Sequence, residues 1–286
     1  MLSDNRNRKL TINAGGKLLD LSRPQVMGIL NVTPDSFYDN SRCPDNATVV
    51  KHVSKLLEDG ADMIDVGGYS SRPGCDDVSI EEEKRRLAIG FEAIRSQNPE
   101  AIISVDTFRA EVARWSVEEW GVQIVNDISG GEMDDKMFDT VARLQVPYVM
   151  MHMRGTPENM MHEQYLHYDD VTADILQYFA AKIERLTYMG INDIIIDPGF
   201  GFSKTIEANY LLMRHLDEFT HLGLPLLVGI SRKSMIYKLL GTTPAESLNG
   251  TTVLNTLALM GGANILRVHD VRQAVEAVKI VTQTIP

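Results

Sequence analysis

The sequence has few cysteines, no long apolar run and no excess of positive charge, and each shortage excludes a class of protein. Only Cys43 and Cys75 occur in 286 residues, which is too few for a disulfide framework, so we expect both to be free thiols. No stretch approaches the ~18 apolar residues that a membrane span needs, and residues 1–9 are polar with no apolar signal core behind them. We therefore expect a cytoplasmic protein with no membrane partner.

The charge balance is negative, with 39 acidic against 28 basic residues and a formal net charge of −11 at pH 7. Nucleic acids and anionic membranes attract basic surfaces, so neither is an expected partner. An anionic ligand would need a local basic pocket. The composition, 44% apolar and 23% charged, is that of a folded globular protein rather than a disordered chain.

Short apolar runs alternate with amphipathic stretches along the chain. Residues 10–21 alternate in polarity about an Asn-Ala-Gly-Gly turn, which predicts a β-hairpin over about residues 8–22. Eight apolar runs, with a polar residue at or soon after the end of each, come next: 26–30, 63–66, 102–105, 124–125, 148–151, 194–196, 226–228 and 265–268. Stretches with the helical period separate them, at 47–58, 80–95, 110–120, 136–143, 171–189, 206–219, 234–240 and 251–260.

This pattern of eight strand–helix units predicts an α/β protein. No Pro/Ser-rich linker or change of composition interrupts the units, so we expect a single (β/α)8 TIM-barrel domain over residues 1–286, with the hairpin closing its bottom. The alternative is a doubly wound dinucleotide-binding sheet. That fold would carry G-x-G-x-x-G after its first strand, where this chain has Asn31-Val-Thr-Pro-Asp-Ser-Phe37.

A first group of polar residues follows strands in the middle of the chain. In a barrel the carboxyl ends of the strands line the active site. Asp106 and Asp197 directly follow apolar runs, where an unpaired carboxylate is costly to bury. With Asn126 they suit a planar, nitrogen-rich heterocycle that presents N–H donors, and Lys233 is a candidate donor. The plainer interpretation is that turns after strands favour Asp and Asn in any protein.

A second group is cationic and comprises Arg72, Lys233, Arg267 and His269. The Ser-Arg-Lys-Ser segment 231–234 precedes an amphipathic stretch, so its backbone N–H groups would lie at a helix N-terminus, where anions bind. This pattern favours a phosphate or carboxylate pocket over a solvated rim. Residues 31–46 and 67–77 are candidate lids over the pocket, and the equal alternative for both is an ordinary surface loop. The histidines at 152, 162 and 167 match no zinc spacing, and the nearby methionines indicate packing.

Taken together, the motifs at the strand ends resemble those of the bacterial dihydropteroate synthases, from about residue 10 to the end of the chain. The nine motifs are Gly28-Ile-Leu-Asn-Val-Thr-Pro-Asp-Ser-Phe37, Ile64-Asp-Val-Gly-Gly68, Ser71-Arg-Pro-Gly74, Ser104-Val-Asp-Thr107, Asn126-Asp-Ile128, Met151-His-Met153, Asp197-Pro-Gly-Phe-Gly201, Gly229-Ile-Ser-Arg-Lys-Ser234 and Arg267-Val-His-Asp270.

The resemblance implies a transferase of folate biosynthesis and a sulfonamide target. Such an enzyme uses Mg2+ to condense 6-hydroxymethyl-7,8-dihydropterin diphosphate with p-aminobenzoate, giving 7,8-dihydropteroate and pyrophosphate through a dissociative step, and it works as a homodimer. The resemblance implies that the pterin lies on Asp106, Asn126, Met151, Asp197 and Lys233. It places the diphosphate on Ser71, Arg72, Arg267 and His269, and p-aminobenzoate on Phe37, Pro73, Phe202 and Ser234. Asn31 would coordinate the metal, and the expected catalytic residues are Asp35, Asp106, Lys233, Arg267 and His269.

The chain departs from the family pattern in places. Tyr69 and Ser71 stand where family members commonly carry Glu and Thr, and the first lid reads Phe37-Tyr-Asp-Asn-Ser41. These changes bear on sulfonamide sensitivity and substrate affinity more than on the reaction. One alternative function is a pterin-binding methyltransferase domain, which has no use for a diphosphate clamp. Another is a catalytically silent pterin-binding partner protein, against which Asn31 and Asp35 count.

Overall fold

An eight-stranded parallel sheet forms the centre of the protein, and the computed structural model describes residues 8–33, 46–70 and 78–284. The strands follow the order β8-β7-β6-β5-β4-β3-β10-β9, and a parallel bridge between Ile196 and Leu226 joins the two ends of this order. The sheet closes on itself, which confirms the predicted (β/α)8 barrel. Its strands are β3 (Gln25–Asn31), β4 (Met63–Gly67), β5 (Ile102–Asp106), β6 (Ile124–Asp127), β7 (Tyr148–Met151), β8 (Ile194–Asp197), β9 (Leu227–Val228) and β10 (Ile265–Val268).

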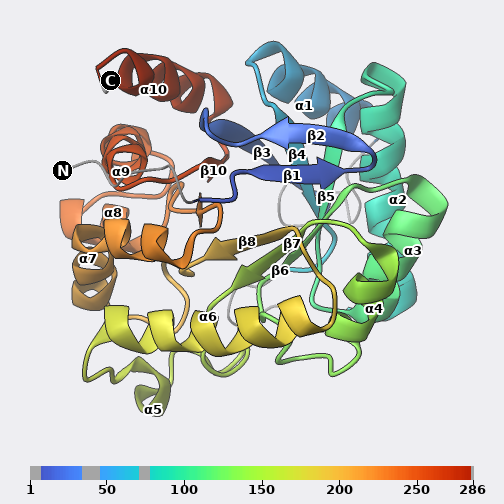
Figure 1. Ribbon diagram of the computed structural model, residues 1–286. Helices are drawn as coiled ribbons and strands as arrows, with labels where there is room; N and C mark the ends of the chain where they lie inside the picture. Colours follow the sequence, from blue (N-terminus) through green and yellow to red (C-terminus); the bar gives the residue numbers. More distant parts are fainter. Residues whose placement is uncertain (1–7, 34–45, 71–77, 285–286) are drawn as a thin grey trace.

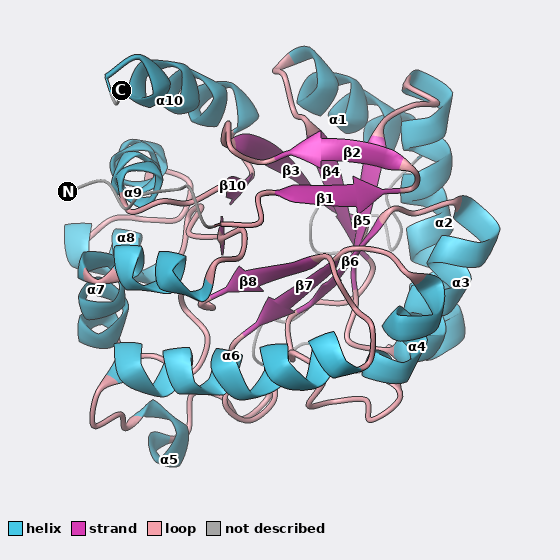
Figure 2. Cartoon of the chain, in the orientation of Figure 1, coloured by secondary structure: helices cyan, strands magenta, loops and turns pink. Residues whose placement is uncertain are grey.

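Helices surround the barrel and cover its outer surface (Figure 1, Figure 2). Their apolar faces pack against the outward-facing side chains of the strands to form the larger part of the core. The helices are α1 (Asn46–Glu58), α2 (Ile80–Gln97), α3 (Ala110–Trp120), α4 (Met137–Leu144), α5 (Glu163–Leu166), α6 (Val171–Tyr188), α7 (Ile206–Arg214), α8 (Ser234–Leu240), α9 (Leu248–Met260) and α10 (Val271–Thr284), with a 3₁₀ helix η3 (Leu216–Leu222).

The prediction of one helix over residues 206–219 is wrong in its extent, because the α-helix ends before His215. This residue has φ −108° and ψ 23°, outside the helical region, and separates α7 from η3. In a 3₁₀ helix, residues three apart lie on one line. The tighter winding therefore brings Leu216, Phe219 and Leu222 to the same side, where they pack against the core.

The last helix, α10, is missing from the amphipathic stretches identified above. Its buried residues include Val271, Ala274, Val278 and Val281, which recur at intervals of three or four. This is the helical period, so the signal for α10 is present in the sequence. The helix packs against α9 and against β3, and it completes the layer of helices beside the junction of β3 with β10.

The N-terminal hairpin closes the bottom of the barrel, as predicted. Strands β1 (Thr11–Ala14) and β2 (Lys17–Asp20) pair antiparallel across Gly15 and Gly16, whose φ angles of 63° and 85° favour glycine. Ile12 is 1% exposed and packs with the apolar layer at the amino ends of the strands. The members of this bottom layer are Met27, Met63, Ile124, Val149, Ile195, Leu227 and Ile265, with Ile102 partly buried beside them. The hairpin therefore leaves the opposite end of the barrel for the site.

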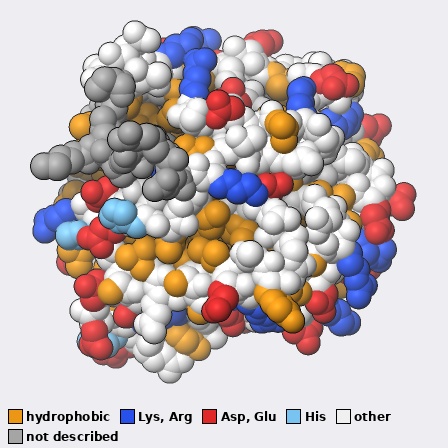
Figure 3. Space-filling model, viewed as in Figure 1, with side chains coloured by type: hydrophobic (Ala, Val, Ile, Leu, Met, Phe, Trp, Pro, Cys, Tyr) orange, Lys and Arg blue, Asp and Glu red, His pale blue; other side chains and the backbone are white. Residues whose placement is uncertain are grey.

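The surface that carries the hairpin shows acidic and basic side chains interspersed with small apolar patches (Figure 3). Among the described residues visible on this face, acidic and basic side chains do not gather into a large area of one charge. Within the described ranges, no helix has the length and apolar character required to cross a membrane.

Candidate active site

Polar side chains gather at the carboxyl ends of the strands, on the inside of the barrel. Side chains two residues apart on a strand face the same side. The residues of the bottom layer point into the barrel, so the residues two or four positions further along the same strands also point inward. The strand register places Asn31 beside Gly67, Gly67 beside Asp106, and Asp106 beside Asn126. On the other side of the mouth, Met151 lies beside Asp197. The structure thus brings together the residues expected to form the heterocycle pocket.

A buried hydrogen-bonded chain connects four strands beneath this mouth. Arg267 on β10 donates from Nε to Asp65 Oδ2 on β4 at 2.6 Å, and from Nη2 to Asp106 Oδ2 on β5 at 2.6 Å. Asn126 on β6 donates from Nδ2 to the same Asp65 Oδ2 at 2.9 Å. Arg267, expected to bind the diphosphate, therefore also compensates the charge of two carboxylates within the barrel.

Of the two carboxylates in this hydrogen-bonded group, Asp106 is the more exposed to solvent. Its side chain is 21% exposed, against 0% for Asp65. Burial raises the pKa of Asp106 to about 7, Arg267 opposes the rise, and the negative charge of Asp65 adds to it. The carboxyl group is therefore poised to change protonation near neutral pH, unlike an exposed aspartate.

A second carboxylate, Asp197, lies across the mouth beside Lys233. Asp197 Oδ1 accepts a hydrogen bond from the backbone N–H of Gly199 at 2.8 Å. Burial raises the pKa of Asp197, whereas the charge of Lys233 lowers it. Burial lowers the pKa of Lys233 to about 8, against the opposing effect of Asp197. The two side chains stabilise each other's charged form in an enclosed position.

The loop after β8 wraps around Lys233. The lysine Nζ donates to the backbone carbonyl of Phe200 at 2.5 Å and lies 4.6 Å from the ring centroid of Phe202, within range of a cation–π contact. Gly199 has φ 73°, and a Cβ there would lie 2.1 Å from the carbonyl oxygen of His152. Glycine is therefore required for the loop to pass this close to the end of β7.

Apolar side chains form one wall of the mouth. Met151 is 2% exposed and packs in a small cluster with Phe108, Ile128 and Met153, and Phe202 packs against this cluster. The expected positions of Met151 as a lining residue and of Phe202 as a ring cover are consistent with this arrangement. Tyr69, at one of the departures from the family pattern, packs edge-on against Phe108 with centroids 5.1 Å apart.

The expected anion-binding side contains His269 and the start of α8. His269 Nδ1 lies 3.0 Å from Ser231 Oγ, which also accepts from the backbone N–H of His269. Ser234 is the first residue of α8, so the predicted helix N-terminus is present. Arg232 instead binds Asp270 through Nε and Nη2, both at 2.9 Å, and so ties this loop to the end of β10.

Several expected site residues lie outside the described residues. They are Asp35, Phe37, Ser71, Arg72 and Pro73, together with Cys43 and Cys75. Their assigned roles stay predictions.

Two buried charged residues had no role assigned to them from the sequence, although Asp65 is among the polar residues near the strand ends. Asp65 lies inside β4 between apolar neighbours, and a carboxylate within an apolar run is a signal that the sequence does contain. Lys204 follows the β8 loop and is 2% exposed. Its Nζ donates to the carbonyls of Gly199 and Phe202 and lies 3.1 Å from His152 Nδ1. No local pattern distinguishes Lys204 from a surface lysine, because its acceptors come from the folded loop.

The oxygen of Asn31 faces the same mouth. A Cβ built on Gly67 would lie 3.2 Å from Asn31 Oδ1 and 3.7 Å from Asp106 Oδ2, so glycine keeps the space between these two oxygens open. Within the described ranges, no group of three or more His, Cys, Asp or Glu side chains is arranged to hold a metal ion. Mg2+ commonly takes one or two protein oxygens and completes its shell with water and substrate phosphates. A single protein oxygen from Asn31 therefore fits a Mg2+ ion that is held mainly by the phosphates of the substrate.

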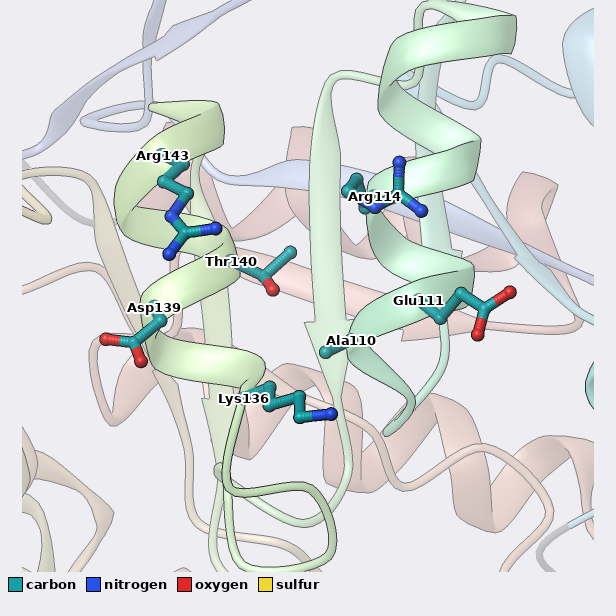
Figure 4. Close-up of a pocket in the computed structure, with 7 residues that line it drawn as sticks. All are labelled: Ala110, Glu111, Arg114, Lys136, Asp139, Thr140 and Arg143. Carbon is teal, nitrogen blue, oxygen red and sulfur yellow. The ribbon is translucent and has the colours of Figure 1, made fainter.

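A separate pocket lies on the outside of the barrel between α3 and α4 (Figure 4). Its lining comprises Ala110, Glu111, Arg114, Lys136, Asp139, Thr140 and Arg143. Glu111 is paired with Lys84 at 2.7 Å, and Arg114 with Glu118 at 2.9 Å. Exposed ion pairs of this kind are typical of a solvated surface, so the strand-end mouth remains the candidate active site.

Comparison with known proteins finds relatives over almost the whole length of this chain. The family model described as "Pterin binding enzyme" matches residues 27–269. The dihydropteroate synthase of Escherichia coli K12 is 46% identical over 274 residues, which cover 95% of each chain. A Yersinia pestis dihydropteroate synthase solved with a sulfonamide drug complex is 43% identical, with a TM-score of 0.88 over 96% of this chain and 98% of that one. A Xanthomonas albilineans dihydropteroate synthase in complex with 7,8-dihydropteroate is 37% identical, with a TM-score of 0.84 over 96% and 100%.

Proposed function

This chain belongs to the pterin-binding enzyme family, within it to the dihydropteroate synthases, and on that premise we propose how its own residues carry out the reaction. The enzyme is a transferase of folate biosynthesis. It condenses 6-hydroxymethyl-7,8-dihydropterin diphosphate with p-aminobenzoate to give 7,8-dihydropteroate and pyrophosphate.

The pterin ring binds between the two acidic sides of the mouth. Asp106 and Asp197 accept hydrogen bonds from ring N–H and amino groups, Asn126 offers an amide beside Asp106, and Lys233 donates to a ring acceptor. Met151 packs against the ring face. The observation that carries this assignment is the meeting of these groups from β5, β6, β7, β8 and the β9 loop in one buried mouth.

The diphosphate binds on the side of Arg267 and His269. We expect Ser71 and Arg72 to complete this clamp, and Asn31 to supply the protein oxygen for Mg2+. The ion would stabilise the negative charge that develops on the leaving pyrophosphate. Arg267 keeps its charge here, because Asp65 and Asp106 oppose the effect of burial and hold the pKa of the guanidinium above its usual value.

The reaction is dissociative in this proposal. The bond between the pterin methylene and the diphosphate oxygen breaks first, the electron pair leaves with pyrophosphate, and the ring nitrogens share the resulting positive charge. We expect Asp35, which lies outside the described residues, to place a negative charge near this cation. The neutral arylamine of p-aminobenzoate then attacks the methylene and loses a proton. We expect Phe37, Pro73 and Phe202 to frame its ring, and its carboxylate to meet the N-terminus of α8 at Ser234.

The protein is expected to work as a homodimer. Large apolar side chains are exposed on neighbouring helices, including Leu239 and Leu240 on α8 and Val253, Leu257 and Met260 on α9. Leu240 is 58% exposed and Met260 is 57% exposed. Monomeric proteins rarely expose large clusters of apolar side chains to water. A second copy of the chain is the proposed cover.

The activity is tested directly with purified protein, Mg2+, the pterin diphosphate and p-aminobenzoate. We expect pyrophosphate and dihydropteroate to form in equal amounts, well above a reaction without enzyme. Omission of p-aminobenzoate should abolish dihydropteroate formation. If neither product exceeds the control without enzyme, the synthase assignment is wrong.

Pterin binding is expected to weaken as the pH falls through about 7. In the unliganded enzyme burial raises the pKa of Asp106 to about 7, and only the ionised carboxylate accepts hydrogen bonds with both oxygens. The dissociation constant of 6-hydroxymethyl-7,8-dihydropterin, which has no titrating diphosphate, should therefore rise on the acid side. Calorimetry between about pH 5.5 and pH 8.5 measures this effect. A constant affinity across the range, or the same profile in Asp106→Asn, would exclude Asp106 as the titrating group.

A further inference from the structure

Asp65 is the deepest charged group of the site, two residues below the end of β4. The strand register places it beside Ile29 of β3 and Ser104 of β5, inside the barrel, and its side chain is fully buried. Burying a carboxylate is costly even when it is paired, and an apolar residue often replaces a buried ion pair without loss of stability. Ile29 shows that an apolar side chain is accommodated in this layer. The charge at position 65 therefore needs a reason other than packing.

The contact with Asn126 determines which way the amide faces. A carboxylate only accepts hydrogen bonds, so the Asn126 group that faces Asp65 Oδ2 at 2.9 Å is the NH2 group. The amide oxygen and the second N–H are thereby directed away from Asp65, and Asn126 lies beside Asp106 in the strand register. With an apolar residue at position 65, either end of the amide would face the mouth.

The contact with Asp65 holds the Arg267 guanidinium at its Nε edge. Nε binds Asp65 Oδ2 at 2.6 Å, and Nη2 reaches Asp106 Oδ2. Because the guanidinium is planar, these two contacts define the plane of the group. One oxygen of Asp65 thus positions both an uncharged and a charged side chain at opposite sides of Asp106.

The other oxygen of Asp65 makes no hydrogen bond to the described residues. Asp65 Oδ1 is buried and accepts no hydrogen bond from the described part of the chain, and Ser104 Oγ beside it likewise has no partner there. A buried acceptor without a partner lowers stability. A residue retained for stability alone would satisfy both oxygens, whereas a residue retained for orientation needs only the one that binds Asn126 and Arg267.

We propose that Asp65 is a positioning residue for the pterin site, which orients the Asn126 amide and the Arg267 guanidinium through a single carboxylate oxygen without touching the substrate. The proposal rests on the assignment of Asn126 and Arg267 to the substrate made above. The residue at position 65 then affects the affinity for the pterin substrate and leaves the affinity for p-aminobenzoate unchanged.

The test compares Asp65→Leu, which removes the acceptor, with Asp65→Asn, which keeps one acceptor oxygen and removes the charge. We expect Asp65→Leu to raise the dissociation constant of 6-hydroxymethyl-7,8-dihydropterin and the KM for the pterin diphosphate at least ~10-fold, with the KM for p-aminobenzoate changed less than about 2-fold. Asp65→Asn should restore a large part of this loss. Ser104→Ala, in the same layer of the next strand, is the matched control and should change neither constant by more than about 2-fold.

The pH dependence of pterin binding provides a second readout, which reports on the charge of Asp65. The negative charge of Asp65 is one of the influences that raise the pKa of Asp106, together with burial, Glu83 and Asp127, while Arg267 lowers it. Lys233 also lies within electrostatic range of Asp106. In both Asp65 variants, the loss of pterin affinity on the acid side (the acid limb) should therefore occur at lower pH.

The outcomes separate this proposal from the proposed function. Wild-type protein that binds no pterin would contradict the function itself. Wild-type protein that binds pterin, with an Asp65→Leu variant of equal affinity or with equal losses for both substrates, would overturn the role of Asp65 alone. If Asp65→Leu does not fold, Asp65→Asn decides: an unshifted acid limb with unchanged pterin affinity refutes the proposal.

Discussion

Replacing Lys233 by alanine is expected to lower kcat/KM for the pterin diphosphate by at least about 100-fold. The lysine lies beside Asp197, donates to the Phe200 carbonyl and sits over the Phe202 ring. Its removal takes away a donor to the pterin and leaves buried Asp197 with only the weaker effects of Arg267 and Lys204 among the positive charges that lower its pKa. The pKa of Asp197 should then rise further, which weakens its hydrogen bonds to ring N–H groups.

Steady-state kinetics with each substrate varied in turn measures this loss. Lys238→Ala is the matched control, because Lys238 is exposed on α8, the helix that Lys233 directly precedes. Lys233→Met retains most of the stem that packs beside Gly201, so its activity should resemble that of the alanine variant if the charge is what matters. Near wild-type rates in both Lys233 variants would refute the pocket as assigned.

The second large effect is expected for Asp106→Ala, with a loss of at least about 100-fold in kcat/KM for the pterin diphosphate. The substitution removes the acceptor nearest the mouth and one of the two carboxylates that hold Arg267. Arg267 would keep only Asp65, so its guanidinium should lose its defined plane. Pterin binding and the alignment of the leaving group should therefore suffer together.

Isothermal calorimetry with the pterin and kinetics with the diphosphate separate these two effects. Asp106→Asn keeps the shape and one acceptor, so it should lose less affinity than Asp106→Ala and should no longer show the acid limb near pH 7. Asp139→Ala removes an exposed carboxylate on α4 and serves as the control. An Asp106→Ala enzyme with unchanged pterin affinity would show that the ring binds elsewhere.

The barrel was predictable because its signals are local. Short apolar runs such as 102–105 and 148–151 are buried on both faces, and the helices between them show the 3.6-residue period. The errors have equally local causes. The stretch 206–219 has one continuous apolar pattern, and only the need to bring Leu216 and Phe219 onto one line in the core divides it at His215.

The candidate site was predictable to a lesser degree. Asp106, Asn126 and Asp197 follow apolar runs, and once the strands are parallel neighbours their ends must meet at one edge. The motif resemblance added roles for residues such as Met151 and Asn31, which no spacing rule would assign. Lys204 was missed because its backbone acceptors at Gly199 and Phe202 exist only in the folded loop.

The sequence by itself therefore determined the class of fold, the hairpin at one end of the barrel and the set of polar residues at the other, since each depends on hydrophobic periodicity and short-range chemistry. The tertiary structure alone decided how those polar residues bind one another. Arg267 reaches Asp65, 202 residues earlier, only because β10 closes the barrel against β3. The raised pKa of Asp106 has the same origin, because burial and the charges of distant strands act on it only after the barrel has closed.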